Sequence, residues 1–308
     1  MSHLRFSTLF VLIIFVGYFA VQLKIYPQLK FNSLTDRIQH PFDSRVRYRI
    51  GEIDPRFNLS KSELITLAQQ AADIWHLGTH QQYFIYDPNA KLSINLVYDE
   101  RQSESEARRN ELEQIEHSKQ SIKEERAKLD ELRDQLDYYH QEIERLRVNY
   151  TTKVDTYNQW INSLNQHNRA YNQNTMNQIE YEKEQLRSEQ AQIQAQIDFF
   201  NERVAQLNQQ VDMINSMKNE INHAVDRFNT QFQPRQFDKG IFNGREINIY
   251  EFNSINDLKL TLAHELGHAL GMLHTDDPYS LMYPMMEKQN IDDFSLRPAD
   301  LQLLNSRR

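Results

Sequence analysis

The sequence predicts an α+β domain that is interrupted by a long antiparallel coiled-coil hairpin and preceded by an N-terminal transmembrane helix. Strand-like and helical patterns occur on both sides of a long insertion, and the insertion spaces its apolar residues by three and four. An uncharged apolar run near the N-terminus predicts the membrane helix. Only 7 glycines and 8 prolines occur in 308 residues. Because these residues interrupt helices, their scarcity also indicates a large helical content.

Net charge and cysteine content exclude several classes of protein. The formal net charge is −8, without the basic excess that favours nucleic acid, so no nucleic-acid partner is expected. The chain has no cysteine, which excludes disulfides, cysteine-ligated zinc and a thiol nucleophile. Any metal ion must therefore be held by histidine or carboxylate side chains.

Residues 1–23 are predicted as an uncleaved signal anchor. The run from Phe6 to Leu23 is uncharged, and roughly 18 residues at about 1.5 Å each reach the lower limit for crossing a membrane. A cleaved signal peptide is the alternative, although Tyr18 stands where a small residue should precede a cut after Ala20. Both alternatives export the rest of the chain to a periplasm or the extracellular space. It stays anchored by its N-terminal helix in the first and is secreted in the second.

The α+β domain begins after a short tether. Residues 24–44 show no clear periodicity and are predicted as that tether, whereas residues 45–100 form the first part of the domain. Ser60 and Glu63 have the spacing of a capping box, which predicts the start of a helix. The predicted elements are a strand from Val46, a helix from Ser60 and strands at 83–86 and 92–98.

Residues 101–233 are predicted as the coiled-coil insertion. Neither glycine nor proline occurs between Pro88 and Pro234, and two series of apolar residues follow a 3.5-residue spacing. Between the series, the asparagine-rich residues 165–178 are predicted as the tip of a hairpin. Each arm would contain on the order of 50–60 residues, or about 75–90 Å of helix. The alternative, one continuous rod that dimerises in parallel, would not return the chain to its domain.

Residues 234–308 are predicted to complete the domain, with a helix that carries a metal site. His264 and His268 are four residues apart, so both imidazoles project from one face of a helix and can reach one ion. Gly271 can adopt positive φ and end that helix, which brings His274 back as a third ligand. Three protein ligands leave one position for water, as in a catalytic zinc site. Glu265 lies one step round the helix, close to that water without being a ligand.

The stretch HELGHALGMLH, with the following threonine and the later SLMYP, resembles the extended zinc motif and Met-turn of metzincin metalloproteases, in their matrixin branch. The resemblance covers residues 45–100 and 234–308 and implies a small twisted sheet plus three helices. It implies that Met282 forms the Met-turn beneath the metal. It also implies that Tyr283 and Pro284 line the S1′ wall.

The resemblance further implies that the substrate lies extended beside an edge strand around Phe237–Phe242. The insertion takes the place of the loop that carries further metal ions in animal matrixins, so one catalytic Zn²⁺ is expected.

The expected function is that of a zinc-dependent endopeptidase, in which a zinc-activated water attacks the peptide bond and Glu265 is the general base. The coiled-coil arm is expected to engage the substrate or a protein partner. The alternative is a coiled-coil adaptor that carries an inactive or regulatory zinc-binding domain. The complete set of three histidines, Glu265, Gly271 and Met282 favours the enzyme.

Overall fold

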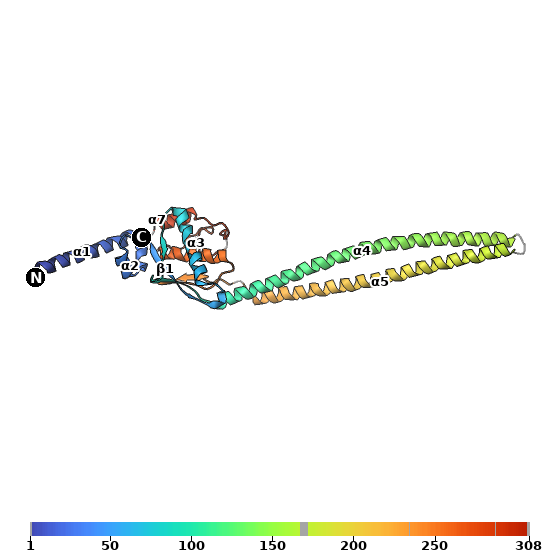
Figure 1. Cartoon of the computed structure of the whole chain (residues 1–308), viewed down its shortest axis with the longest axis horizontal. Helices are drawn as coiled ribbons and strands as arrows, with labels where there is room; N and C mark the ends of the chain where they lie inside the picture. Colours follow the sequence, from blue (N-terminus) through green and yellow to red (C-terminus); the bar gives the residue numbers. More distant parts are fainter. Residues whose placement is uncertain (1, 167–171, 234, 287, 307–308) are drawn as a thin grey trace. The chain divides into compact units, whose positions relative to one another are not determined.

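The computed structural model describes residues 2–166, 172–233, 235–286 and 288–306 (Figure 1). The chain divides into two units. Met1–Arg109 together with Phe232–Arg308 form the first, which we call the sheet unit. Asn110–Gln231 form the second, which we call the hairpin unit.

A five-stranded sheet in the order β2-β1-β3-β5-β4 lies at the centre of the sheet unit. The strands are β1 Val46–Ile53, β2 Phe84–Tyr86, β3 Leu92–Leu96, β4 Gly240–Phe242 and β5 Glu246–Ile249. Neighbouring strands are parallel except β4, which is antiparallel to β5. Because β4 is the last strand in this order, one side of its backbone has no strand partner among the described residues.

Three helices complete the predicted α+β plan: α3 Lys61–Thr79, α6 Ile255–Ala269 and α7 Pro298–Ser306. The predicted capping box is confirmed, because the Ser60 side chain accepts from the backbone N–H of Glu63 and the Glu63 carboxylate accepts from the Ser60 backbone. α3 packs against α6, and the indole N–H of Trp75 donates to the Ala263 carbonyl at 2.9 Å. Trp75 is fully buried, so this bond joins the two helices inside the core.

The N-terminal helix α1 spans Ser2–Ile25. Within the residues that the structure describes, no helix is long and apolar enough to cross a membrane. The predicted N-terminal transmembrane helix is therefore not confirmed. The last turns of α1 carry polar contacts instead: the Tyr18 hydroxyl and the Gln22 amide both donate to the Pro41 carbonyl, at 2.6 and 2.8 Å.

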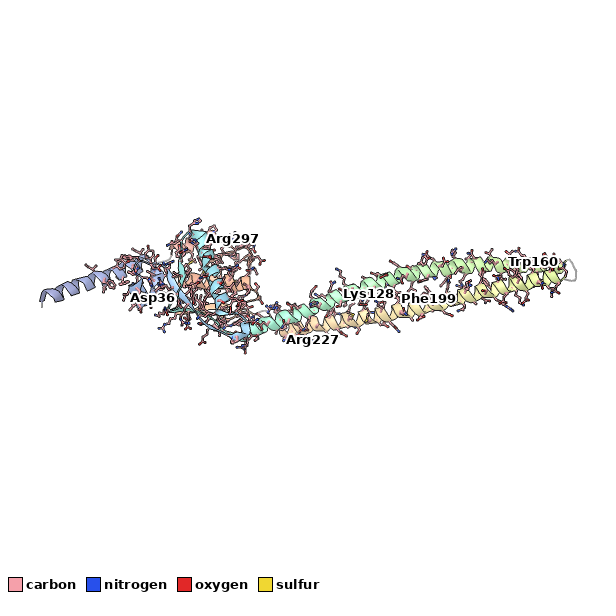
Figure 2. The ribbon with its side chains drawn as sticks, viewed as in Figure 1. Asp36, Lys128, Trp160, Phe199, Arg227 and Arg297 are labelled. Carbon is pink, nitrogen blue, oxygen red and sulfur yellow. The ribbon has the colours of Figure 1, made fainter. Side chains whose placement is uncertain are left out.

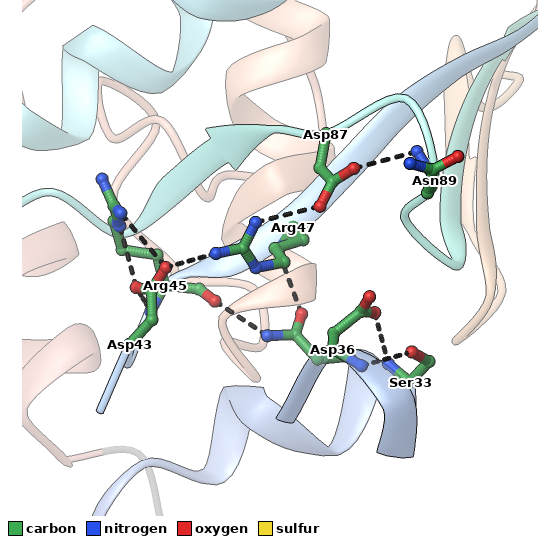
Figure 3. Close-up of polar contacts among 8 residues, drawn as sticks. Ser33, Asp36, Asp43, Arg45, Arg47, Asp87 and Asn89 are labelled. Atoms are coloured by element: carbon green, nitrogen blue, oxygen red, sulfur yellow. Dashed lines mark hydrogen bonds and ion pairs between the residues drawn. The ribbon is translucent and has the colours of Figure 1, made fainter. Parts of the chain in front are cut away.

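The segment predicted as a tether contains two short helices, η1 Pro27–Phe31 and α2 Leu34–Gln39. Between them, the Asn32 amide donates to the Arg45 carbonyl and its oxygen accepts from the Arg47 N–H, both at 2.9 Å. This side chain thus occupies one donor and one acceptor of the backbone around the start of β1. Nearby, the guanidinium of Arg47 pairs with Asp43 at 2.8 Å and with Asp87 at 2.9 Å (Figure 3).

This charge network predicts a pH dependence of stability. Burial alone would raise the pKa of Asp43, but hydrogen bonds and charges from Arg45 and Arg47 outweigh it and lower that pKa below 3.8. A carboxyl whose folded pKa is lowered contributes stability above its unfolded pKa and loses it as the pH falls through the folded pKa. We therefore expect part of the free energy of unfolding to be lost below about pH 4. Urea denaturation at pH 5 and pH 3 measures the loss, which should be smaller in Asp43→Asn; an equal loss contradicts the assignment.

Two long helices, α4 Glu100–Gln166 and α5 Gln173–Gln231, supply the hairpin unit. Cross-contacts pair Glu125 with Gln210, Tyr139 with Phe199 and Lys153 with Glu189, which is an antiparallel order. Figure 2 shows the side chains along both helices, including Lys128 on α4 and Phe199 on α5.

Apolar side chains form the seam between the two helices. Ile122, Leu129 and Ile214 form one buried cluster within it. The predicted antiparallel pairing is thus present, whereas the coiled-coil geometry stays a prediction. The predicted tip includes residues 167–171, which lie outside the described residues.

The first turns of α4 belong to the sheet unit and contact the chain that returns from the insertion. Arg101 donates to the Asp238 carbonyl at 3.0 Å, and Glu104 pairs with Arg235 at 2.7 Å. Gln102 is buried and accepts from the Phe252 N–H at 3.0 Å. The two ends of the insertion are therefore joined directly by polar bonds.

Candidate metal centre

Helix α6 holds two of the three predicted ligands with their ring orientations set by the backbone. His264 Nδ1 lies 2.6 Å from the Leu281 carbonyl oxygen, and His268 Nδ1 lies 2.9 Å from the Met272 carbonyl oxygen. A carbonyl oxygen only accepts, so each Nδ1 carries the proton and each Nε2 keeps its lone pair. The two Nε2 atoms are 3.2 Å apart. Their lone pairs therefore converge, as ligands of one ion require.

A sharp turn after α6 brings the third histidine to the other two. Gly271 has φ +89°, a conformation that favours glycine, and the Met272 N–H donates back to the Gly267 carbonyl at 3.2 Å. The ligand nitrogens of His264, His268 and His274 all lie within 4.8 Å of one another. This turn performs the role predicted for Gly271.

The protonation of the cluster suits a divalent metal. Burial lowers the pKa of His264 to about 3, and the charge of His268 lowers it further in the same direction. Burial also lowers the pKa of His268. Both imidazoles are thus neutral at physiological pH, which is the form that coordinates zinc. Three imidazoles without a thiolate or a carboxylate match the donor set of a catalytic zinc site.

Glu265 lies beside the histidines with an unusual environment for a carboxyl group. It is 4 % exposed, and burial raises its pKa to about 7, against a backbone hydrogen bond from Phe242 that lowers it. The nearby charge of Asp238 adds to the rise. Its Oε2 atom has no hydrogen-bond partner among the described groups. A carboxyl with a free oxygen and a pKa near neutrality can accept a proton and release it again.

The edge strand β4 passes very close to Glu265. A Cβ atom at Gly240 would lie 2.8 Å from Glu265 Cγ and 2.9 Å from its Oε1. Only glycine allows this approach of the backbone to the carboxyl group. No role was predicted for Gly240, and its place within the predicted edge strand around Phe237–Phe242 was the available signal.

Met282 lies beneath the histidines, fully buried against α6. A Cβ atom at Gly267 would lie 2.3 Å from Met282 Sδ and 2.8 Å from the Trp75 ring. The Thr275 N–H donates to the Met282 carbonyl at 2.9 Å, which closes the loop that carries His274. The predicted Met-turn residue therefore packs directly under the helix that holds the ligands.

This packing predicts the effect of a single methyl group. Gly267→Ala should lower the free energy of unfolding by about 1–3 kcal/mol, since overpacking outweighs the gain in helix propensity. Gly17→Ala is the matched control, because a Cβ atom at Gly17 would have no neighbour within 4 Å. Thermal denaturation of both variants measures the difference. Equal melting temperatures for Gly267→Ala and the wild-type protein would contradict this packing.

Asp300, which sequence analysis missed, holds the Met-turn from below. Its carboxylate is fully buried and accepts from the Ser280 hydroxyl and from the backbone N–H groups of Leu281, Met282 and Arg297. The three N–H bonds measure 3.1, 3.0 and 2.9 Å. The only local signal is its position in the first turn of α7, where a carboxylate favours the helix N-terminus.

A cavity of about 630 Å³ opens over the three histidines and Glu265. β4 lines one part of it, and the predicted wall residues Tyr283 and Pro284 line another. Lys30 and Phe31 of η1 also line it. These two residues belong to the predicted tether, and no role in a site was predicted for them. All eight predicted site residues except Met282 line the cavity, and Met282 supports it from below.

Comparison with known proteins agrees with this arrangement. The model of the family described as matrixin matches residues 40–306. Matrix metalloproteinase-16 of Rattus norvegicus is 49% identical over 47 residues, which are 15% of this chain and 8% of that protein. Matrilysin of Felis catus is 46% identical over 39 residues, which are 13% of this chain and 15% of that protein. The chain therefore matches at most about a sixth of the length of these relatives.

Proposed function

The chain belongs to the matrixin family, and from this membership and the geometry of the cavity we propose that it is a zinc-dependent endopeptidase. One observation supports this function above all others. Three histidines converge within 4.8 Å beside a buried carboxyl group, and all of them line an open cavity. A purely structural metal site would need neither the cavity nor Glu265.

The side chains of the cavity can each take a part in peptide hydrolysis. Zinc, when bound by His264, His268 and His274, would supply Lewis-acid activation of water and of the peptide carbonyl. Glu265 would accept the proton of the attacking water at its free Oε2 and donate it to the departing amine. The unpaired edge of β4 would align the peptide by backbone hydrogen bonds. Tyr283 and Pro284 would bound the pocket for the residue after the cleaved bond.

Zinc removal tests this function directly. The full-length protein should contain one zinc per chain by elemental analysis and should cleave members of a mixed peptide library. Dialysis against a chelator should abolish cleavage, and one equivalent of zinc should restore it. Zinc binding without cleavage of any peptide would overturn the endopeptidase and favour the adaptor alternative. A chain that binds no zinc would contradict both.

The hairpin unit is proposed to engage the substrate or a protein partner. Tyr138 and Phe199 are 66 % and 41 % exposed, and large exposed aromatic side chains are typical of contact surfaces. Replacing both by serine should slow cleavage of a folded protein substrate and leave short peptides unaffected. Export and membrane anchoring of the chain stay predictions from residues 1–23.

A further inference from the structure

The N-terminal segment contributes a wall to the cavity. η1 places Lys30 and Phe31 among the residues that line it, next to the end of β4. The Phe31 ring meets the Phe242 ring edge-on, with centroids 4.9 Å apart. Lys30 Nζ lies 4.8 Å from the centroid of the Phe31 ring and is otherwise exposed. A cation therefore lies at the rim of the cavity, close to the strand that would align a peptide.

Buried neighbours hold this segment in place. Leu29 is fully buried, and Gln28, which is 1 % exposed, donates its amide to the Ser44 carbonyl at 3.1 Å. Asn32 follows directly and forms its two bonds to the backbone around β1. Lys30 thus extends from a segment that is fixed on both sides.

Lys30 differs from the other two cations of the cavity in its lack of a partner. Arg235 pairs with Glu104 at 2.7 Å. Lys239 pairs with Glu251 and Asp257, at 3.1 and 2.6 Å. Among the described residues, no carboxylate forms an ion pair with Lys30. Its charge is therefore the one that remains available for a ligand in the cavity.

We propose that Lys30 is a specificity-determining residue. It would select peptides that, when aligned along β4, place a carboxylate just past Phe242. This assignment rests on the proposed function, because it takes the cavity to be the peptide site. A peptide aligned by β4 would pass Phe242 and then meet Lys30, supported on the Phe31 ring. An acidic side chain at that position satisfies the ammonium group, whereas a basic side chain meets a like charge. The C-terminal carboxylate of a short peptide could pair with the ammonium group in the same way.

Cleavage of a charge-varied peptide library by the full-length protein tests this assignment. At one position of the peptide, wild type should prefer Asp or Glu to Lys by about three- to tenfold in kcat/KM. Lys30→Glu should reverse this preference at the same position. Lys91→Glu changes the net charge equally at an exposed residue outside the cavity and should keep the wild-type preference. Peptides with an amidated C-terminus lack the terminal carboxylate, so they show whether Lys30 recognises a side-chain carboxylate or the peptide's C-terminus.

A binding measurement keeps this assignment separable from catalysis. Fluorescence anisotropy measures the binding of acidic peptides to two inactive proteins, Glu265→Ala and the double variant Glu265→Ala, Lys30→Glu. The double variant should bind these peptides more weakly. Cleavage with the same charge preference in wild type and Lys30→Glu would overturn the role of Lys30 alone. Failure of all cleavage, with binding that still depends on Lys30, would overturn the proposed function and keep the charge selection. If Lys30→Glu changes neither the affinity for acidic peptides nor the charge preference of cleavage, the assignment is overturned.

Discussion

Glu265→Gln is expected to lower the rate of peptide cleavage by roughly 10²–10⁴-fold, the usual contribution of a positioned general base. Glutamine keeps the shape of the side chain and can accept the backbone hydrogen bond from Phe242, but it cannot take a proton. The three histidines stay unchanged, as do the carbonyl groups that orient His264 and His268. Zinc content should therefore remain at one per chain while turnover is lost. The loss should appear in kcat, since the proton transfer occurs after the peptide has bound.

Steady-state kinetics on one cleaved peptide, with elemental analysis of the same sample, measures both quantities. Glu246→Gln is the matched control, because Glu246 is exposed at the start of β5 and lies outside the cavity. It should retain full activity. Glu265→Gln that keeps wild-type activity would show that another group moves the proton. Loss of zinc from the variant would instead assign Glu265 a part in holding the metal.

Asp300→Ala is expected to lower the free energy of unfolding by roughly 3–5 kcal/mol, a large part of a typical total. The substitution removes the carboxylate that accepts from three buried donors of the Met-turn and from the Arg297 N–H. Each unsatisfied buried donor costs about 1–3 kcal/mol, although the losses are not additive. The Leu281 carbonyl, which orients His264, belongs to the same turn. Zinc affinity should therefore fall together with stability.

Chemical denaturation with and without zinc separates the two effects. Asp293→Ala, a change of the same kind at an exposed position, should leave both stability and zinc affinity within experimental error. The stability of Asp300→Asn should lie between those of the wild-type protein and Asp300→Ala. An amide keeps one acceptor oxygen, but its NH₂ group would face the donors that the carboxylate now accepts from. A stability of Asp300→Ala within about 0.5 kcal/mol of wild type would contradict the role of this carboxylate.

Local patterns in the sequence were sufficient to predict helix α6 and most of the strands. The spacing of His264 and His268 depends only on helix geometry, and the turn after α6 needs only a glycine at the right place. The pair Asn243-Gly244 is a common turn sequence, and Gly244 has φ +89°. The role of Asp300 could not be predicted, because its four donors come from residues 280–297 and meet only after the chain has folded.

The N-terminal segment was harder to read from sequence. Ser33 and Asp36 form a capping box, and that spacing was visible in the sequence although no helix was predicted from it. The place of Lys30 depends on contacts of Phe31 with Phe242, which lies more than 200 residues away. The spacing of apolar residues along the sequence does not reveal a contact between residues so far apart. The membrane helix was predicted from the length and the lack of charge of residues 6–23, a pattern from which the contacts of Tyr18 and Gln22 with Pro41 could not be inferred.

The pairing of β3 with β5 sets an order of events in folding. Leu96 and Glu246 belong to adjacent parallel strands, although the entire insertion separates them in the chain. Closing so long a loop is slow when the intervening chain is unfolded, because its entropy must be lost before the strands gain contacts. Helices form faster than distant strands pair, so the insertion is expected to fold first and bring its two ends together. Arg101 and Glu104 would then join the returning chain. Since β4, β5 and α6 all follow the insertion, a nascent chain cannot assemble its histidine cluster until the whole insertion and His274 have been synthesised, which delays any proteolytic activity to that point.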